Sequence, residues 1–321
     1  MIRTGFCDVI GIEVPVVQAG MGPFGSGAEL AAAVSNAGGL GTVGASGRHA
    51  DDLKEQLARV RTLTDRPFAV NFAHHQRTDE GIEIALESTA RVFSYTVGDP
   101  VDLVARVQDT GKLFMQQVHT VEQAERMSDR GVDIIIAQGG EAGGFGGYIS
   151  TLVLVPEVAR AVSPLPVIAA GGISHGRALA AALVLGAQGA NVGTRFLASV
   201  EASLAEDWKK LIVAASSEDA VKVDFWWDMM PPPPGEFNVL PRALQTSFIE
   251  RWIHRRDDVR SEGERIMSEL GPAVQQGRMH EFVPFTGQSA GAIDEILPAA
   301  EIVRLLVEDA EQALRESAEL L

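Results

Sequence analysis

The sequence predicts an α/β protein, a (β/α)8 barrel with an insertion after the eighth strand and a C-terminal helix. Eight short apolar or β-branched runs recur within roughly the first two hundred residues. Segments rich in Ala, Leu and Glu separate them, most with apolar residues at the three- and four-residue spacing of a helix. Because an open doubly wound sheet usually has about five or six strands, eight strand and helix units favour a closed barrel.

The predicted strands are short, mainly apolar or β-branched runs, which indicates burial on both faces and therefore a parallel sheet. Helical crossovers between the strands are required by the same arrangement. In chain order the strands are Pro15–Ala19, Leu40–Val43, Phe68–Phe72, Val92–Tyr95, Leu113–Val118, Val132–Gln138, Pro166–Ala170 and Gly189–Gly193. The helices between them are Glu29–Asn36, Asp51–Arg61, Glu80–Glu87, Pro100–Gln108, Val121–Asp129, Leu152–Val162 and Ser174–Leu185.

The pattern changes after the eighth strand, which divides the chain into a barrel (1–215), an insertion (216–291) and a C-terminal segment (292–321) whose helix, near Ile293–Leu320, is expected to pack on the barrel. The insertion holds Phe225-Trp226-Trp227 and the charged amphipathic stretch Ala243–Met267, so we expect it to be partly helical. The run Pro231–Pro234 with Gly235 predicts a stiff, extended connection. The aromatic cluster is either a lid over the active face or a satellite core.

Composition excludes several classes of protein. The 321-residue chain carries 27 Lys and Arg against 43 Asp and Glu, a formal net charge of −16, without a basic run that would bind nucleic acid or an anionic membrane. It lacks a signal-peptide pattern and an apolar stretch long enough to span a membrane, which favours a cytoplasmic protein. The single Cys7 excludes an internal disulfide and is predicted to be a small buried residue.

A (β/α)8 barrel carries its chemistry on the loops at the carboxyl ends of its strands. Two such loops indicate a phosphate site, because backbone N–H groups without side chains can approach an anion. Gly171-Gly172-Ile173-Ser174 follows the seventh strand, with Ser174 predicted to cap the helix that begins at His175. Asn191-Val192-Gly193-Thr194-Arg195 follows the eighth strand. Neither the spacing of metal ligands such as H-E-x-x-H nor a G-x-S-x-G elbow is present.

Several motifs, in order and in register with all eight strands from about residue 10 to 200, resemble the nitronate monooxygenase family, also called 2-nitropropane dioxygenases. They are Q-A-G-M-G at 18–22, L-A-A-A-V-S-N-A-G-G-L-G-T-V-G at 30–44, Q-G-G-E-A-G-G at 138–144, A-A-G-G-I-S-H-G-R at 169–177 and G-A-x-G-A-N-V-G-T-R-F at 186–196. The resemblance implies an FMN-containing TIM barrel, an oxidoreductase related to the flavin-dependent enoyl-ACP reductases.

The same resemblance implies where FMN binds. Asn71 is expected to hydrogen-bond the flavin ring region, while the backbone around Ala19–Gly22, with Met21 and Gly22, runs along the isoalloxazine. Gln138 and Gly143 match flavin-contacting positions. The phosphate is expected at Gly171 and Gly172 and at the run Asn191, Val192, Gly193 and Thr194, which is the place that the barrel argument also indicates for an anion.

The sequence departs from the family at Phe145. Familiar members continue this glycine-rich motif with a histidine, the acid-base residue near the flavin, and a phenyl ring transfers no proton. Three interpretations stay open. A nitronate is already ionised and needs no base; another histidine supplies the proton, with His74 and His75 preferred over His49 and His119; or Phe145 widens an apolar wall for a hydrophobic or acyl-thioester substrate.

We therefore expect an FMN-dependent, nitronate monooxygenase-like oxidoreductase that acts on a small-molecule nitronate with O2 as acceptor. One alternative is a reductase or dehydrogenase of enoyl or acyl thioesters that uses NAD(P)H, which would bind transiently over the flavin because no separate G-x-G-x-x-G unit is visible. Another is a flavin-binding relative without the family reaction. A homodimer is an expectation that the sequence leaves open.

Overall fold

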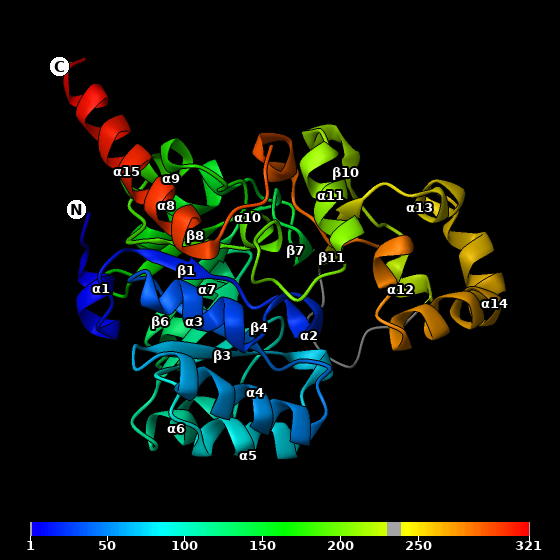
Figure 1. Ribbon diagram of the computed structural model, residues 1–321, viewed down its shortest axis with the longest axis horizontal. Coiled ribbons are helices and arrows are strands. Elements are labelled where there is room, and N and C mark those ends of the chain that lie inside the picture. The colour runs from blue at the N-terminus through cyan, green and yellow to red at the C-terminus, as the bar shows by residue number, and fades with distance from the viewer. Residues whose placement is uncertain (1, 230–238, 321) are drawn as a thin grey trace.

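The computed structural model describes residues 2–229 and 239–320, and it confirms the predicted (β/α)8 TIM barrel (Figure 1). Eight parallel strands follow one another in the order β1-β9-β8-β6-β5-β4-β3-β2. A parallel bridge between Val17 and Leu40 joins β1 to the segment leading into β2 and so closes the barrel. The strands are β1 (Val16–Gln18), β2 (Gly41–Gly44), β3 (Phe68–Ala73), β4 (Val92–Thr96), β5 (Leu113–Val118), β6 (Ile134–Gln138), β8 (Val167–Ala170) and β9 (Ala190–Val192).

Helices cover the outside of these strands. They are α3 (Ala28–Asn36), α4 (Ala50–Leu63), α5 (Asp79–Glu87), α6 (Leu103–Gln108), α7 (Val121–Asp129), α8 (Thr151–Ala161), α9 (Gly176–Val184), α11 (Glu206–Ala214) and α15 (Ala299–Ala318). Shorter helical segments precede the first strand or lie in the connections between the other elements. They are α1 (Gly5–Ile10), α2 (Gly22–Gly25), η1 (His74–Gln76), α10 (Thr194–Leu197) and η2 (Ser217–Asp219). The apolar helix stripes pack on the sheet and form the larger core.

The barrel interior has a second core, which fills the end at which the strands begin. Strand residues such as Val17, Leu40 and Ile134 meet Phe6 and Cys7 of α1 there. Cys7 is buried and free, as predicted. Because this end is closed by apolar packing, polar side chains of the barrel can gather at the opposite, carboxyl end of the strands.

The segment after α11 forms a small sheet and a group of helices beside the barrel (Figure 1). Its elements are β10 (Ala220–Lys222), α12 (Trp226–Met229), β11 (Leu240–Leu244), α13 (Ser247–Trp252), α14 (Arg256–Gln275), η3 (Met279–Glu281) and η4 (Gln288–Ala292). Its aromatic residues pack into a core of their own, with Phe225, Phe248 and Trp252 among the buried members. The predicted Pro231–Pro234 connection with Gly235 lies outside the described residues.

The structure corrects three local predictions. The loop 139–150 contains a short strand, β7 (Gly144–Gly146), which pairs with β11 in a three-stranded sheet of order β10-β11-β7. Ser174 does not cap α9: the helix begins at Gly176 and His175 occupies the cap position without a side-chain bond. The last helix begins at Ala299, one residue after Pro298, whose ring fixes φ in a conformation suited to a helix entrance.

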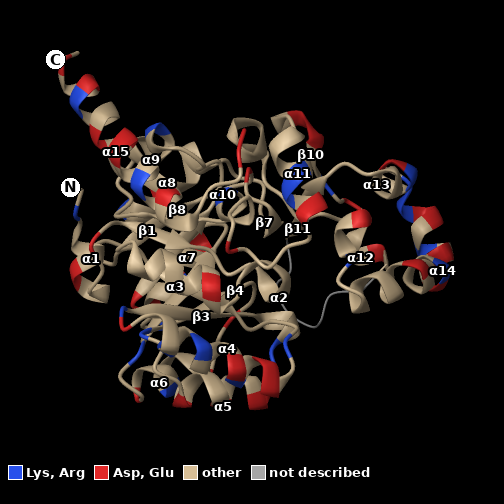
Figure 2. Cartoon of the chain, viewed as in Figure 1, with Lys and Arg blue, Asp and Glu red and all other residues tan. Residues whose placement is uncertain are grey.

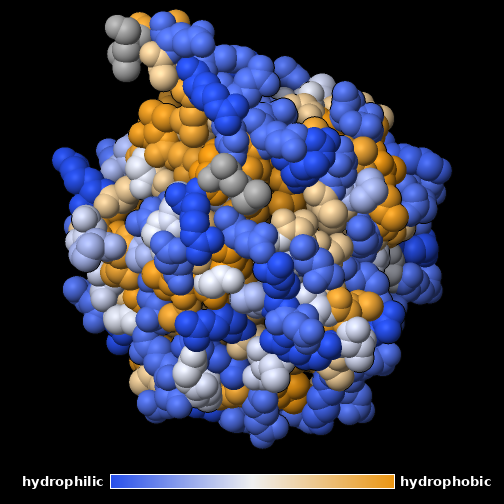
Figure 3. All heavy atoms as spheres, turned by 60° about the vertical axis from the view of Figure 1, so that its left-hand side comes forward, coloured by the Kyte–Doolittle hydropathy of each residue, from blue (hydrophilic) through white to orange (hydrophobic). Residues whose placement is uncertain are grey.

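Charged residues lie mainly on the outer helices, as Figure 2 shows for α4, α5, α14 and α15, while the barrel strands carry few. The face in Figure 3 is largely hydrophilic, with hydrophobic residues gathered between the two chain ends. No helix in the described ranges is both long and apolar enough to cross a membrane. The homodimer stays a prediction.

Candidate active site

The predicted flavin residues from the first strands lie together at the carboxyl end of the barrel. Asn71 of β3 is buried, and its side chain covers Gly20, where a Cβ would come within 2.3 Å of Asn71 Oδ1. Its Nδ2 donates to Ser94 Oγ of β4 at 3.1 Å. Because Gly20 has no side chain, the Asn71 side chain has room to extend at the carboxyl end of the strands.

The end of β9 faces the loop after β1. A Cβ on Gly193 would lie 3.7 Å from Ala19 Cβ and 3.8 Å from Met21 Sδ, so the two predicted segments are neighbours across the barrel seam. Gly22 has φ of +65°, a conformation that L side chains rarely adopt. The residues Asn191, Val192 and Thr194 are buried. Gly193, Ala19 and Met21 thus lie together at the mouth of the barrel, which is the open end at the carboxyl ends of its strands, whereas Val192 packs in the larger core.

The predicted phosphate loop has donors without partners. Gly171 and Gly172 both have positive φ, and a Cβ on Gly172 would meet nothing nearer than Glu141 Cβ at 3.7 Å. Within the described part of the chain, the N–H groups of Gly172 and Thr194 donate no hydrogen bond. The buried hydroxyl of Ser174 has no partner either. Such a set of N–H and O–H donors fits the phosphate of FMN.

Glu141 fixes the glycine-rich loop to the start of α8. Its carboxylate accepts bonds from Thr151 N–H at 3.0 Å and from Thr151 Oγ1 at 2.8 Å. The other side of the loop packs on the segment after β11, where a Cβ on Gly143 would lie 2.6 Å from Gly287 N. Gly287 N in turn donates to Thr194 Oγ1 at 2.9 Å. Gly287 was missed by sequence reasoning, because no local motif marks it.

Gln138 at the end of β6 is held by a buried imidazole. His119 Nε2 lies 3.0 Å from Gln138 Oε1 and 3.3 Å from Gln117 Nε2. Burial, together with the smaller effect of the nearby Lys222 ammonium, lowers the pKa of His119 to about 4. His119 is therefore neutral at pH 7 and serves to orient the Gln138 amide, as a hydrogen-bonded neighbour of the mouth.

Phe145 lies in an aromatic cluster between barrel and insertion. Its ring stacks on Trp227 at a centroid distance of 5.4 Å and meets Trp226 and Phe285 at 5.8 Å each. The ring of His75 stands edge-on to it at 4.9 Å. The position at which the family has an acid-base histidine is thus part of an apolar wall.

The two histidines that we preferred as a substitute base, His74 and His75, contact different residues. His74 Nδ1 lies 2.8 Å from the Tyr95 hydroxyl, which Arg77 also contacts at 3.0 Å, whereas His75 faces Phe145. The pKa of both histidines is lowered, chiefly by burial, so both are neutral at pH 7. Only His75 is next to the family histidine position; the catalytic role of either remains a prediction.

Two cations from the small sheet complete the mouth, and sequence reasoning named neither. Lys222 Nζ donates to the Gly146 and Leu240 carbonyls at 2.9 and 3.1 Å, and Arg242 Nη2 donates to the Gly140 carbonyl at 2.9 Å. Burial and the neighbouring Arg242 charge lower the pKa of Lys222 to about 8. Since these residues follow the loop by 76 and 102 positions, local patterns carry no sign of them.

Comparison with known proteins identifies relatives of this arrangement. The model of the nitronate monooxygenase family matches residues 3–81 and 75–309. A Mycobacterium tuberculosis protein named (3aS,4S,5R,7aS)-5-hydroxy-7a-methyl-1-oxo-octahydro-1H-indene-4-carboxyl-CoA dehydrogenase is 36% identical over 253 residues, 78% of this chain and 68% of its own length. A Paraburkholderia phytofirmans nitronate monooxygenase is 29% identical over 98% of this chain and 97% of its own. The structure of FabK from Thermotoga maritima superposes with a TM-score of 0.90, at 31% identity and full coverage of both chains.

Proposed function

The chain belongs to the nitronate monooxygenase family and is an oxidoreductase, and from this premise we propose that it transfers hydride between FMN and an acyl thioester. The observation that carries the proposal is Phe145, an apolar ring that cannot transfer a proton at the position where the family has its acid-base histidine. A CoA thioester appears in the name of the mycobacterial relative. Nitronate oxidation, our first expectation from the sequence, becomes the second candidate.

The residues present fit FMN. The donors at Gly172, Thr194 and Ser174 would hold the phosphate, while Asn71 and Gln138 would face the ring. Bound FMN supplies two-electron chemistry, which no amino-acid side chain provides. Backbone N–H groups and a hydroxyl can bind the phosphate anion without a cluster of Lys or Arg, which agrees with the net charge of −16 of this chain.

The wall around Phe145 suits an acyl chain. Trp227, Phe145 and Val239 present apolar surface at the carboxyl end of the barrel, and burying an acyl methylene there is worth about 0.8 kcal/mol. The carbon chain would exchange a hydride with bound FMN, and solvent would supply or accept the proton at the carbon next to the thioester carbonyl. Lys222 is mostly protonated at pH 7, since its pKa is about 8, and so supplies positive charge beside this wall.

Nitronate oxidation with O2 as acceptor is the second candidate, favoured by the full-length nitronate monooxygenase relative. An ionised nitronate needs no base, and for a nitroalkane we propose the neutral His75 imidazole beside Phe145 as the base. We propose that NAD(P)H binds transiently as the electron donor in the thioester reaction. We also propose that the protein acts in the cytoplasm.

Absorbance spectroscopy distinguishes the two candidates. FMN-loaded protein is titrated without oxygen with butyryl-CoA, propyl nitronate, NADH and NADPH in separate cuvettes, and crotonyl-CoA is then added to the reduced protein. We expect butyryl-CoA or NAD(P)H to bleach the flavin and crotonyl-CoA to restore it. Bleaching by the nitronate alone, with recolouring in air, would refute the thioester proposal and establish the second candidate.

A further inference from the structure

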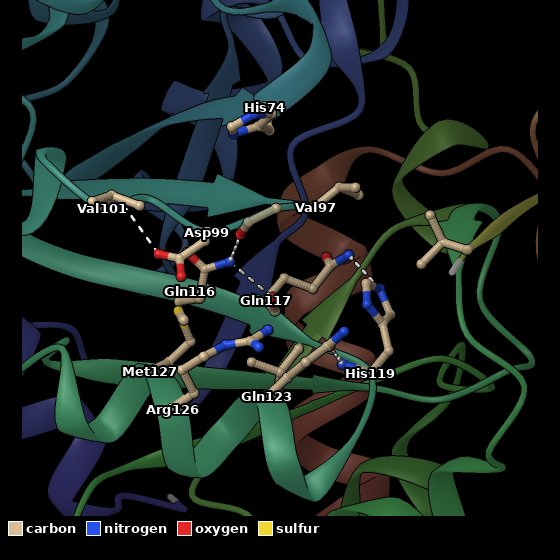
Figure 4. Close-up of a pocket in the computed structure, with 13 residues that line it drawn as sticks. His74, Val97, Asp99, Val101, Gln116, Gln117, His119, Gln123, Arg126 and Met127 are labelled. Atoms are coloured by element: carbon tan, nitrogen blue, oxygen red, sulfur yellow. Dashed lines mark hydrogen bonds between the residues drawn. The ribbon is translucent and has the colours of Figure 1, made fainter. Parts of the chain in front are cut away.

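A cavity of about 320 Å³ lies between the ends of β4 and β5 and helix α7, next to the mouth described above. Figure 4 shows its lining residues, with Asp99 and Val101 on one side and His119 on the other. Its volume is at the lower end of the roughly 300–1,000 Å³ of ligand pockets. It therefore has room for a chain-like part of a substrate.

The cavity runs from solvent to the flavin side. Val101 at one end is 54% exposed, whereas Gln116 and His119 on the inner wall are 1% and 4% exposed. His119 also contacts Gln138, which is predicted to touch the flavin. A ligand that enters beside Val101 would thus extend toward the place of hydride transfer.

Gln116 gives this cavity an unused acceptor. Its Nε2 donates to the carbonyls of Gln117 at 3.0 Å and Gly98 at 3.3 Å, while its buried Oε1 has no partner among the described residues. A buried acceptor without a donor costs about 1–3 kcal/mol, so a ligand group that donates to Gln116 Oε1 would remove this cost. The neighbouring Val97 has φ of +56°, which is rare for a β-branched residue and indicates a backbone held against strain.

The rest of the lining defines the ligand. Val97, Val101, Val118, Met127 and Val239 are apolar, and Arg126 of α7 adds a guanidinium, which can only donate. The other lining side chains are polar, and the Asp99 carboxylate already accepts a hydrogen bond from Arg130 at 3.0 Å. A chain that alternates apolar and polar groups and offers one N–H to Gln116 and one oxygen near Arg126 would match this lining. A secondary amide within an alkyl chain has this composition.

Resting on the thioester function above, we propose that this cavity is the channel for the pantetheine arm of the substrate, with an amide N–H of the arm bonded to Gln116 Oε1. The arm contains secondary amides separated by short alkyl segments and ends at the thioester sulfur. CoA and acyl carrier proteins both supply it. The higher kcat/KM of crotonyl-CoA or of a crotonyl carrier protein identifies which of the two is the source.

Binding of pantetheine itself tests the channel without any redox turnover. Isothermal titration calorimetry compares wild type, Gln116→Leu, Val101→Trp and the matched control Gln312→Leu on an exposed position of α15. We expect Gln116→Leu to raise Kd about tenfold, as the loss of an ordinary hydrogen bond would. Val101→Trp, which alters only an exposed side chain, should raise Kd more than tenfold by narrowing the entrance, whereas Gln312→Leu should leave it unchanged.

Kinetics with two thioesters completes the test. Gln116→Leu should lower kcat/KM about tenfold for crotonyl-pantetheine and less than about twofold for S-butyl thiocrotonate, which lacks an amide. Equal losses on both thioesters, or a pantetheine Kd that neither Gln116→Leu nor Val101→Trp changes, would overturn the channel. Pantetheine binding that depends on Gln116, together with a flavin that no thioester bleaches, would refute the proposed function and retain the channel.

Discussion

Replacing Gly172 by aspartate should abolish tight FMN binding. A side chain here meets no protein atom closer than 3.7 Å, so steric clash within the loop is small, and the left-handed φ of +73° costs about 1–2 kcal/mol in any L residue. The carboxylate would face the phosphate site. At about 4 Å and an effective dielectric constant near 20, two unit charges repel by about 4 kcal/mol, roughly a thousandfold in Kd.

Fluorescence titration of FMN into the apoprotein measures this effect at fixed salt concentration. Gly172→Asn is the matched control, because it has the same shape and no charge. Gly111→Asp places the same charge on a glycine of similar φ, +77°, in the loop before β5 at the other end of the barrel. The Tm of the apoprotein reports separately any repulsion between the introduced carboxylate and Glu141. A Kd for Gly172→Asp equal to that of Gly172→Asn would refute our placement of the phosphate.

Three further perturbations test the mouth. Phe145→His should create or raise oxidation of neutral nitroalkanes by restoring an imidazole at the family position, measured as oxygen uptake; no gain would mean that the pocket has diverged beyond this residue. His75→Ala should lower turnover about a hundredfold if it is the substitute base, while unchanged turnover in both His75→Ala and His74→Ala would eliminate the pair. His119 has a pKa of about 4 when folded against 6.5 when unfolded, so the unfolded state binds more protons between these values and stability falls as pH falls from 6.5 to 4, by up to about 3 kcal/mol. Urea unfolding of His119→Gln should show a smaller acid loss, and an identical loss would contradict the burial argument.

The sequence predicted the barrel because its signals are local. Apolar runs such as Leu113–Val118 and the helical spacing between them fix strands and crossovers, and their alternation admits few topologies. The glycine pair Gly171-Gly172 indicated a phosphate loop, and its positive φ angles agree with that geometry. Its role as the FMN site stays a prediction, like those of the other site residues.

The Ser174 cap shows how local reasoning can fail. A serine before a helix-like run usually caps it, but the extended residue His175 separates Ser174 from the helix, and the buried Ser174 hydroxyl has no partner among the described residues. That feature agrees better with a ligand at the loop than with a helix cap. The missed strand Gly144–Gly146 has a similar origin, because glycines give no strand signal and the pairing partner lies in β11.

By itself, the sequence determined the fold, the family motifs and the absence of the family histidine at Phe145. Tertiary structure decided what surrounds that stretch: Trp227 stacks on Phe145 and Lys222 bonds the Gly146 carbonyl, both from the insertion. Gln116, whose Oε1 has no partner in the described ranges, lines a cavity that no motif marks. The physical reason is that backbone conformation follows from neighbours three or four positions apart, whereas a site is made by side chains that only the closure of the barrel and the packing of the insertion bring together.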